Sequence, residues 1–469
     1  MTTSAAHLDA RPDDGDSPPG TPFALPPVVW FLVAAALALR LLAAYRANLT
    51  FDERAHLALA ETIRWDTGGV HLVWRSLDHP PLSLYLMKLS GWIFGTSDLG
   101  LRVIHVLLGA ATVALVYRLG RRAIGCGAGE WAAALLVFDQ FHLSWSRVFM
   151  PEVPMLFFAT AALVTMLRAV ERGRQRDFLL LGLLLGVAYL ANETALVLVP
   201  ALWLYLAVTP DHRAVLRRPA WYAAHIVMLL VVAPDVIGNL RHFDESYLHR
   251  DWMMARGSSW PSLKALSLYL GESFRWALGA DVLDREYLDG NVFVCHWPAG
   301  LLYLAGVVAA LKWRRQTGVG LLLVVFAVVI VCFTLLPAGG RFEPFWWASL
   351  SLVPAVVFGG GLLDRFALSG RAARWTAAAA LTYLAFAVLP AAWRAGPALP
   401  RADVEAFVAD TLRRAETAIA RGDWEEARNR FLFVLNLGGP RAEAYCGLAR
   451  VAVHDADLPA ARRMIDKCL

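Results

Sequence analysis

The chain has 469 residues, of which 58% are hydrophobic and only 18% are charged. A typical soluble domain contains about 25% charged residues, and the mean hydropathy of this chain is high, at +0.49. The apolar residues form blocks of about 14 to 20 residues, as in membrane spans. This composition excludes a soluble globular protein and a secreted disulfide scaffold. The lack of period-two alternation in short segments excludes an outer-membrane barrel.

The first 26 residues differ from the rest of the chain. Residues 1–26 are rich in Pro, Gly, Asp and Ser and have no apolar period, which predicts a disordered cytoplasmic tail. A basic start followed at once by an apolar stretch, as in a cleavable signal peptide, is missing. We therefore expect the first apolar block, 28–45, to be an uncleaved signal anchor. The five cysteines are scattered without metal-ligand spacing, so we expect isolated thiols.

The apolar blocks predict an all-α polytopic membrane domain over residues 27–395 with about eleven transmembrane helices. The expected spans are 28–45, 101–117, 130–146, 153–168, 178–191, 194–208, 220–237, 298–311, 318–336, 345–363 and 375–393. Basic clusters follow every second span, and such clusters favour the cytoplasmic side. This pattern places the N-terminus inside, the loops 46–100 and 238–297 outside, and the C-terminal tail outside. Two further apolar segments, 80–95 and 261–278, are expected to lie at the outer interface, with spanning helices as the alternative.

The C-terminal tail, residues 401–469, has the composition of a soluble helical domain. Trp424 and Leu458 are 34 residues apart, as are Ala427 and Ala461. This spacing is the tetratricopeptide period, so we predict a tetratricopeptide-like helical region, with a generic helical hairpin as the alternative. Such short arrays rarely fold alone, so the tail is expected to pack on the membrane domain or to bind a protein partner.

Ionisable residues cluster on the predicted outer side of the membrane. Asp52, Glu53, Arg54 and His56 directly follow the first span, and His79 precedes a pair of prolines in the same loop. Adjacent carboxylates at a membrane surface repel each other and lose hydration, so they require a partner or a function. Further along the chain, the same side gathers Asp139, Arg147, Glu152 and Arg341. Clusters of this kind favour a functional site over simple helix capping.

The order of these motifs resembles the C-type integral-membrane glycosyltransferases, in particular the protein O-mannosyltransferase and aminoarabinose (lipid A) transferase families. The resemblance covers roughly 28–363. It rests on Asp52-Glu53 after the first span, His79-Pro-Pro-Leu in the same loop, Arg102, the run from Asp139 through Ser146-Arg147 to Glu152, and Arg341-Phe-Glu-Pro. The chain departs from relatives at Asn192, where many have a lysine thought to hold the donor phosphate.

The resemblance implies transfer of a sugar from a polyprenyl-phosphate donor to a hydroxyl or amine of a protein, lipid or glycan acceptor. Asp52 is the expected base, giving inversion, with Glu53 and Glu152 as further catalytic residues. The expected substrate-binding residues are Arg54, His56, His79, Lys88, Arg102, Asp139, Arg147, Asn192 and Arg341. A divalent metal is an open possibility, with Glu53, His56, His79 and Glu152 as candidate ligands.

Two other functions remain open at this stage. A transporter or flippase for a lipid-linked glycan should show inverted repeats and charges at mid-membrane, whereas here the acids gather at one interface. A non-catalytic scaffold would recruit partners through its tail and leave the acids idle. The composition, rich in Ala, Arg and Leu, suggests a bacterial inner (plasma) membrane with the active face periplasmic, in contact with membrane lipid and no nucleic acid.

Overall fold

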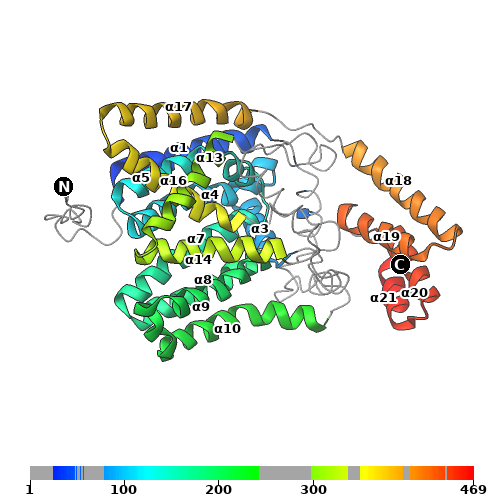
Figure 1. Ribbon diagram of the computed structural model, residues 1–469. Helices are drawn as coiled ribbons and strands as arrows, with labels where there is room; N and C mark the ends of the chain where they lie inside the picture. Colours follow the sequence, from blue (N-terminus) through cyan, green and yellow to red (C-terminus); the bar gives the residue numbers. More distant parts are fainter. Residues whose placement is uncertain are drawn as a thin grey trace, which may run out of the picture.

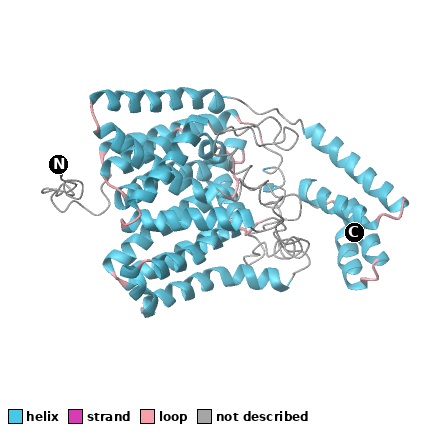
Figure 2. Ribbon diagram, in the orientation of Figure 1, coloured by secondary structure: helices cyan, strands magenta, loops and turns pink. Residues whose placement is uncertain are grey.

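The computed structural model describes residues 25–47, 49, 53, 56–57, 79–241, 297–335, 349–393, 401–438 and 441–469. Over these residues the regular structure is helical, and no strand is present (Figures 1 and 2). The all-α architecture predicted from the apolar blocks is therefore confirmed. The predicted disordered tail and the predicted interfacial helix 261–278 lie outside the described residues, apart from the short stretch before α1.

The membrane domain is a bundle of helices that follow the predicted apolar blocks. In chain order they are α1 (Pro27–Arg46), α3 (Leu82–Phe94), α4 (Asp98–Ala123), α5 (Cys126–Val137), α6 (Gln140–Ser146), α7 (Glu152–Arg172), α8 (Gln175–Ala191), η1 (Glu193–Val197), α9 (Leu198–Val208), η2 (Pro210–Arg217), α10 (Pro219–Arg241), α13 (Trp297–Ala310), η4 (Leu311–Trp313), α14 (Thr317–Leu335), α16 (Ser349–Leu368) and α17 (Arg371–Trp393).

The number of crossings stays a prediction. Within the described residues, 6 helices are long and apolar enough to cross a membrane, or up to 7 if a bent helix pair counts as one span. Four shorter apolar helices accompany them, at Leu82–Phe94, Cys126–Val137, Pro298–Trp313 and Thr317–Cys332. In Figure 1, α1 begins at one end of the bundle and α17 ends at the other.

The expected span 130–146 is interrupted. Helix α5 ends at Val137, and α6 begins at Gln140 after a break at Phe138 and Asp139. A helix of 12 residues is about 18 Å long, well short of the roughly 30 Å of hydrocarbon in a bilayer. Non-helical backbone at membrane depth is tolerated only when protein covers it. Residues 132–137 and 141–150 are indeed buried.

Helices α4, α5 and α16 pack at backbone distance through glycines. A Cβ added to Gly120 of α4 would lie 2.9 Å from the Cα of Gly129 in α5. A Cβ added to Gly360 of α16 would lie 2.5 Å from the backbone nitrogen of Ala132. Small residues at such positions let helices associate in lipid, where the hydrophobic effect does not drive their packing. These contacts fix α5 in place although it is short.

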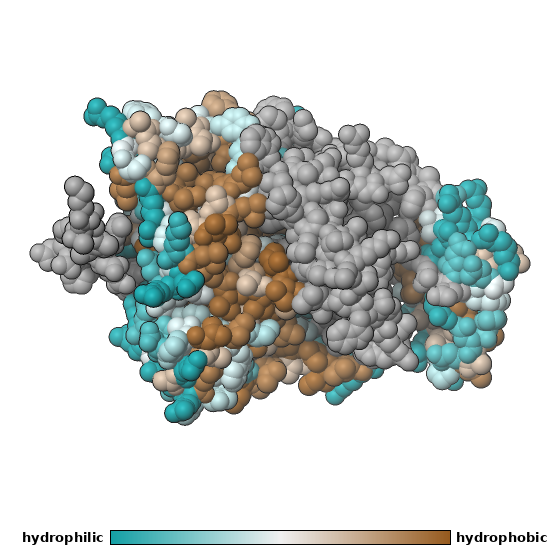
Figure 3. Space-filling view, in the orientation of Figure 1, coloured by the Kyte–Doolittle hydropathy of each residue, from teal (hydrophilic) through white to brown (hydrophobic). Residues whose placement is uncertain are grey.

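Lipid-facing residues surround this bundle. Figure 3 shows hydrophobic residues over the middle of the bundle and hydrophilic residues over the end where the N-terminal tail emerges. Large apolar side chains on α1 and α10 are more than half exposed, namely Trp30, Phe31, Tyr45, Ile226, Leu229, Leu230 and Leu240. An exposed apolar surface of this extent is the signature of contact with membrane. The chain is a multi-pass membrane protein.

The tail forms two helical hairpins. They comprise α18 (Arg401–Ala420) with α19 (Trp424–Gly438), and α20 (Ala442–His454) with α21 (Leu458–Cys468). Helices α19 and α21 begin at Trp424 and Leu458, the two positions that the 34-residue spacing had aligned. The helical region agrees with the prediction, while its assignment to the tetratricopeptide class stays a prediction.

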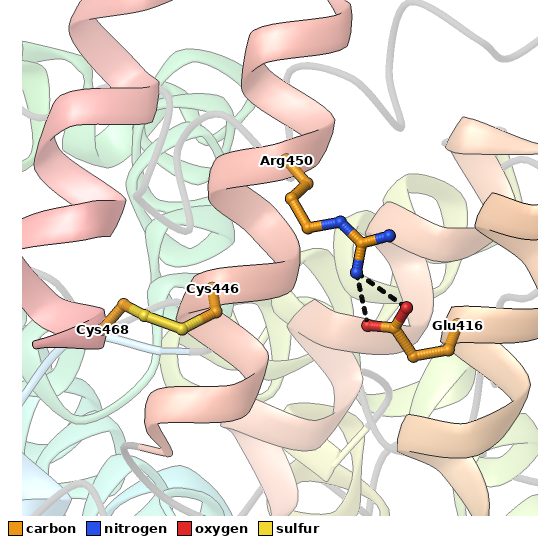
Figure 4. Close-up of a disulfide and its surroundings, with 4 residues drawn as sticks. All are labelled: Glu416, Cys446, Arg450 and Cys468. Atoms are coloured by element: carbon orange, nitrogen blue, oxygen red, sulfur yellow. Dashed lines mark hydrogen bonds and ion pairs between the residues drawn. A yellow bond between two sulfur atoms is a disulfide. The ribbon is translucent and has the colours of Figure 1, made fainter.

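A disulfide joins Cys446 of α20 to Cys468 of α21, with their Cα atoms 5.1 Å apart (Figure 4). Nearby, Arg450 donates hydrogen bonds to both carboxylate oxygens of Glu416 in α18 (Figure 4). The expectation of isolated thiols is wrong for this cysteine pair. The hairpin brings together two residues that lie 22 positions apart, a contact that local spacing does not reveal.

Candidate active site

The best-defined polar contact at the predicted outer end of the bundle joins Glu53 to Arg102. Nε of Arg102 lies 2.7 Å from Oε1 of Glu53, and Nη2 lies 2.6 Å from Oε2. Both side chains are fully buried. Nη1 of Arg102 donates to the carbonyls of Ala44 and Ala47, at the end of α1. This bidentate pair ties the start of the first outer loop to both α1 and α4.

The segment after α6 contributes to the same site. The backbone N–H of Phe149 donates to Oε1 of Glu53 over 3.2 Å. Arg147, the C-cap of α6, is 5% exposed and lies within electrostatic range of both Glu53 and Arg102. Burial, followed by the charge of Arg102, lowers the pKa of Arg147 to about 10, while Glu53 opposes the shift. The site therefore gathers two arginines around one carboxylate.

A second set of contacts joins α3 and α4 to this segment. Oγ of Ser83 donates to the carbonyl of Phe149 and lies 3.0 Å from Nε2 of His105. His56, which is 4% exposed, lies within electrostatic range of His105. The carbonyl and the N–H of Phe149 are thus held by Ser83 and Glu53 respectively. Phe149 connects the two sets of polar residues.

The His-Pro-Pro loop binds the end of α8. Nδ1 of His79 lies 3.1 and 3.0 Å from the two carboxylate oxygens of Glu193. Their side chains are 19% and 10% exposed, so this pair is more accessible than Glu53 and Arg102. Paired prolines restrict the backbone after His79 and help to fix its direction. The loop is therefore anchored at the helix break 192–193.

Asn192 has a local structural role at this break. Its side-chain Oδ1 accepts from the N–H and the hydroxyl of Thr194, at 3.0 and 2.7 Å. It acts as the N-cap of η1, which separates α8 from α9. Two helical segments therefore replace one long helix over 178–208, as the basic clusters predicted.

Asp139 lies in a buried network at the α5–α6 break. Its Oδ1 accepts from the N–H of His142, so it caps α6, and its Oδ2 accepts from the Tyr303 hydroxyl at 2.9 Å. Arg40 of α1 donates to Nδ1 of His142 over 2.7 Å and lies within electrostatic range of Asp139. These contacts join α1, α6 and α13. In this structure Asp139 is thus engaged by the protein rather than exposed to a substrate.

The structure also places the other expected site residues. Glu152 is 3% exposed and occupies the first turn of α7, and Lys88 is half-buried on α3. Asp52, Arg54 and Arg341 lie outside the described residues. Arg102, expected to bind substrate, directs its guanidinium at Glu53 and the α1 backbone instead.

The candidate metal ligands are engaged with other partners. Arg102 binds both carboxylate oxygens of Glu53, and His79 binds Glu193. In the part of the chain that the structure describes, no three His, Cys, Asp or Glu side chains are close enough to hold a metal ion. A metal bound through Glu53 would have to displace the Arg102 guanidinium.

Several residues of these networks were missed by sequence reasoning. Glu193 was not predicted as a site residue, and its contact with His79 joins positions 114 residues apart. Ser83, His142 and Tyr303 belong to no recognisable local motif. Their partners come from distant helices, so only the packing of the bundle identifies them.

Comparison with known proteins supports the resemblance. Residues 78–237 match the family model described as dolichyl-phosphate-mannose-protein mannosyltransferase. An uncharacterised protein of Aquifex aeolicus is 27% identical over 268 residues, covering 55% of this chain and 48% of that protein. A polyprenol-phosphate-mannose–protein mannosyltransferase of Corynebacterium glutamicum is 30% identical over 138 residues, covering 27% of this chain and 26% of the relative. The chain spans about half, or less, of the length of these relatives.

The fold has a counterpart among solved structures. The crystal structure of ArnT from Cupriavidus metallidurans bound to undecaprenyl phosphate superimposes with a TM-score of 0.55 and 15% sequence identity. The match covers 94% of this chain and 75% of that one. At this identity the likeness shows a shared fold. Residues 78–237 thus resemble the dolichyl-phosphate-mannose-protein mannosyltransferase family, within a chain whose fold is similar to that of ArnT.

Proposed function

We propose that this protein is a membrane glycosyltransferase that moves a sugar from a polyprenyl-phosphate donor to a hydroxyl or amine of an acceptor. The observation that carries the proposal is the buried Glu53–Arg102 pair. It holds the residue next to Asp52 against α1 and α4, at the end of the bundle that the basic clusters predict to be extracytoplasmic. The family match over residues 78–237 supports the same reaction class.

The geometry suits a lipid-linked donor. The polyprenyl chain can stay in the bilayer while its phosphate and sugar reach the outer ends of α1, α3, α4 and α7. The His79–Glu193 pair is more exposed than the Glu53–Arg102 pair, so a substrate can approach it. This pair is therefore suited to bind the acceptor or the sugar. We assign the predicted active face to the periplasmic side of a bacterial inner membrane.

The proposed reaction is a single displacement at the anomeric carbon. Asp52 accepts the proton of the attacking acceptor hydroxyl or amine as the new bond to the anomeric carbon forms. The bond from that carbon to the phosphate oxygen breaks, and polyprenyl phosphate leaves with the bonding electrons. The transition state resembles an oxocarbenium ion, and the configuration inverts.

In this scheme Glu53 and Arg102 are positioning residues. Their bidentate contact fixes the backbone on one side of Asp52, and their burial excludes water that would otherwise compete for the hydrogen bonds. Positive charge for the leaving phosphate is proposed to come from Arg147, Arg341, Arg54 or Lys88, because the Arg102 guanidinium is already bound to Glu53. Glu152 remains a proposed catalytic carboxylate at the start of α7.

The test is a transfer assay with purified protein in lipid. Radiolabelled polyprenyl-phosphate hexoses and pentoses are offered with three acceptors: a Ser/Thr-rich peptide, lipid A and a cell-wall glycan. We expect label on one acceptor class, and we expect Asp52→Asn to abolish transfer. Asp98→Asn is the matched control, since Asp98 is an exposed acid in the first turn of α4.

Two outcomes would contradict the proposal. Transfer that survives Asp52→Asn rejects the assigned base. Movement of the donor between leaflets without transfer to any acceptor favours the flippase and rejects the enzyme. The anomeric configuration of the product, read by nuclear magnetic resonance, tests inversion independently.

A further inference from the structure

A pocket opens at the opposite end of α7 from Glu152. Its volume is about 620 Å³, and it is lined by Arg172, Gly173, Gln175, Arg218, Pro219, Ala220 and Ala223. Helix α7 has 21 residues and is therefore about 30 Å long, so the pocket is remote from the candidate active site. The basic clusters predict that this end of the bundle is cytoplasmic.

The pocket is electropositive. Two arginines line it and no acid does. The acids closest in sequence to Arg172 and Gln175 have other partners, since Glu171 binds Arg122 and Asp177 binds Arg168. Within the described residues, neither lining arginine forms an ion pair. The pocket therefore has two guanidinium groups for an anion from outside the chain.

The backbone adds to this charge. Helix α8 begins at Gln175 in the pocket wall, and no side chain caps its first N–H groups. Helix α10 begins at Pro219 in the same wall. The positive ends of the α8 and α10 dipoles thus lie beside the two arginines, and the C-terminal end of α7 lies in the same wall at Gly173. Such an arrangement binds phosphate groups.

Gly173 allows one of the arginines to enter the pocket. It ends α7 in the left-handed conformation, with φ of 64°. A Cβ at this position would lie 2.5 Å from Nη1 of Arg218. The guanidinium therefore lies directly over the glycine backbone, and a Cβ at this position would require the Arg218 side chain to shift.

Exposed apolar residues begin next to the pocket. On α8 they are Leu179, Leu180 and Leu183, and on α10 they are Tyr222, Ile226 and Leu229, all at least 36% exposed. The two helices are in contact at Gly182, where a Cβ would lie 2.0 Å from the carbonyl oxygen of Ala224. Acyl chains would thus lie over the outer faces of these helices, directly beneath a headgroup in the pocket.

We propose that this pocket binds the phosphodiester headgroup of an anionic phospholipid of the cytoplasmic leaflet. A soluble phosphate would use the same arginines but would gain nothing from the apolar stripes. Basic pockets between helices at this level of the membrane bind anionic headgroups. The proposal concerns binding alone and does not depend on the proposed transfer reaction.

The experiment measures binding of pyrene-labelled phosphatidylglycerol to the full-length protein in phosphatidylcholine nanodiscs by energy transfer from tryptophan. The double variant Arg172→Gln/Arg218→Gln is expected to lower the preference for phosphatidylglycerol at least about tenfold. Arg174→Gln/Arg176→Gln removes the same charge from the connection between α7 and α8 but not from the pocket wall, and it is expected to lower the preference less than about threefold.

Further variants keep the proposal testable if the arginine changes disturb folding. Ala223→Leu narrows the pocket while leaving both arginines in place, and it should weaken binding without changing thermal stability in pure phosphatidylcholine. Equal losses in the two double variants would show diffuse surface attraction and overturn the site. Competition by inorganic phosphate or glycerol phosphate would identify a soluble anion as the ligand and overturn the lipid assignment.

Discussion

Loss of Arg102 should damage stability and activity together. The guanidinium makes four hydrogen bonds, two to Glu53 and one each to the carbonyls of Ala44 and Ala47. In Arg102→Gln the buried Glu53 carboxylate loses its bidentate partner, while Arg147 remains within electrostatic range. Removing one member of a fully buried ion pair costs about 3–5 kcal/mol. We expect a loss of that size in the free energy of unfolding, and loss of sugar transfer.

An apolar double variant separates the effect of the charge from that of the geometry. Glu53→Leu/Arg102→Met removes both charges and fills similar volume, so it should regain all but about 1–2 kcal/mol of the stability. Transfer should stay lost, because the carboxylate no longer fixes the backbone beside Asp52. The free energy of unfolding is measured by sodium dodecyl sulfate titration in mixed micelles, and transfer is measured in liposomes.

An exposed pair supplies the control for this comparison. Arg122 and Glu171 form an ion pair whose side chains are 27% and 45% exposed. Arg122→Gln should cost less than about 1 kcal/mol, because water replaces the lost partner. The reasoning is refuted if Arg102→Gln costs no more than this control, or if the apolar double variant transfers sugar at the wild-type rate.

Three further predictions test other contacts. His79→Ala and Glu193→Gln should each lower kcat/KM about tenfold. The double variant should be no worse than either single variant, because each of them already removes the same His79–Glu193 contact. Additive losses would contradict a shared role. Asp139→Ala should lower the free energy of unfolding by about 2–4 kcal/mol, because α6 loses its N-cap and the Tyr303 hydroxyl loses its acceptor. The KM for the donor should be unchanged. A raised KM at normal stability would instead indicate that Asp139 contacts the substrate. In intact cells Cys446 and Cys468 should react with maleimide only after reduction, because disulfides persist outside the cytosol; labelling without reductant would place the tail inside.

The helices could be predicted from the sequence, because in lipid each apolar helix satisfies its backbone hydrogen bonds internally and does not depend on neighbouring helices for them. Sequence reasoning also identified the two ends of the site, since Glu53 and His79 occur in recognisable local motifs. It predicted two helices over 178–208 from charge alone, and the structure has a helix break at Asn192, while two crossings stay a prediction.

The interaction partners of these site residues could not be predicted from the sequence. Arg102 was expected at the donor phosphate, but its charge is used by Glu53, 49 positions earlier in the chain. The interruption of the third expected span at Phe138 was missed, because a window of hydropathy averages over one aspartate. In each case a contact between distant segments decides the role of the residue, and a single sequence carries no record of such contacts.

The interruption between α5 and α6 constrains the order in which the chain enters the membrane. An aspartate at the centre of an isolated helix raises the cost of insertion by about 2.5–3.5 kcal/mol. Arg40, which lies within electrostatic range of Asp139, is synthesised before it, but Tyr303 follows 164 residues later. Residues 126–146 therefore acquire their full set of partners only after both α13 and α16, which packs on α5 at Gly360, have been synthesised. We expect a nascent chain that stalls before Tyr303 to hold this segment less firmly than the complete chain does.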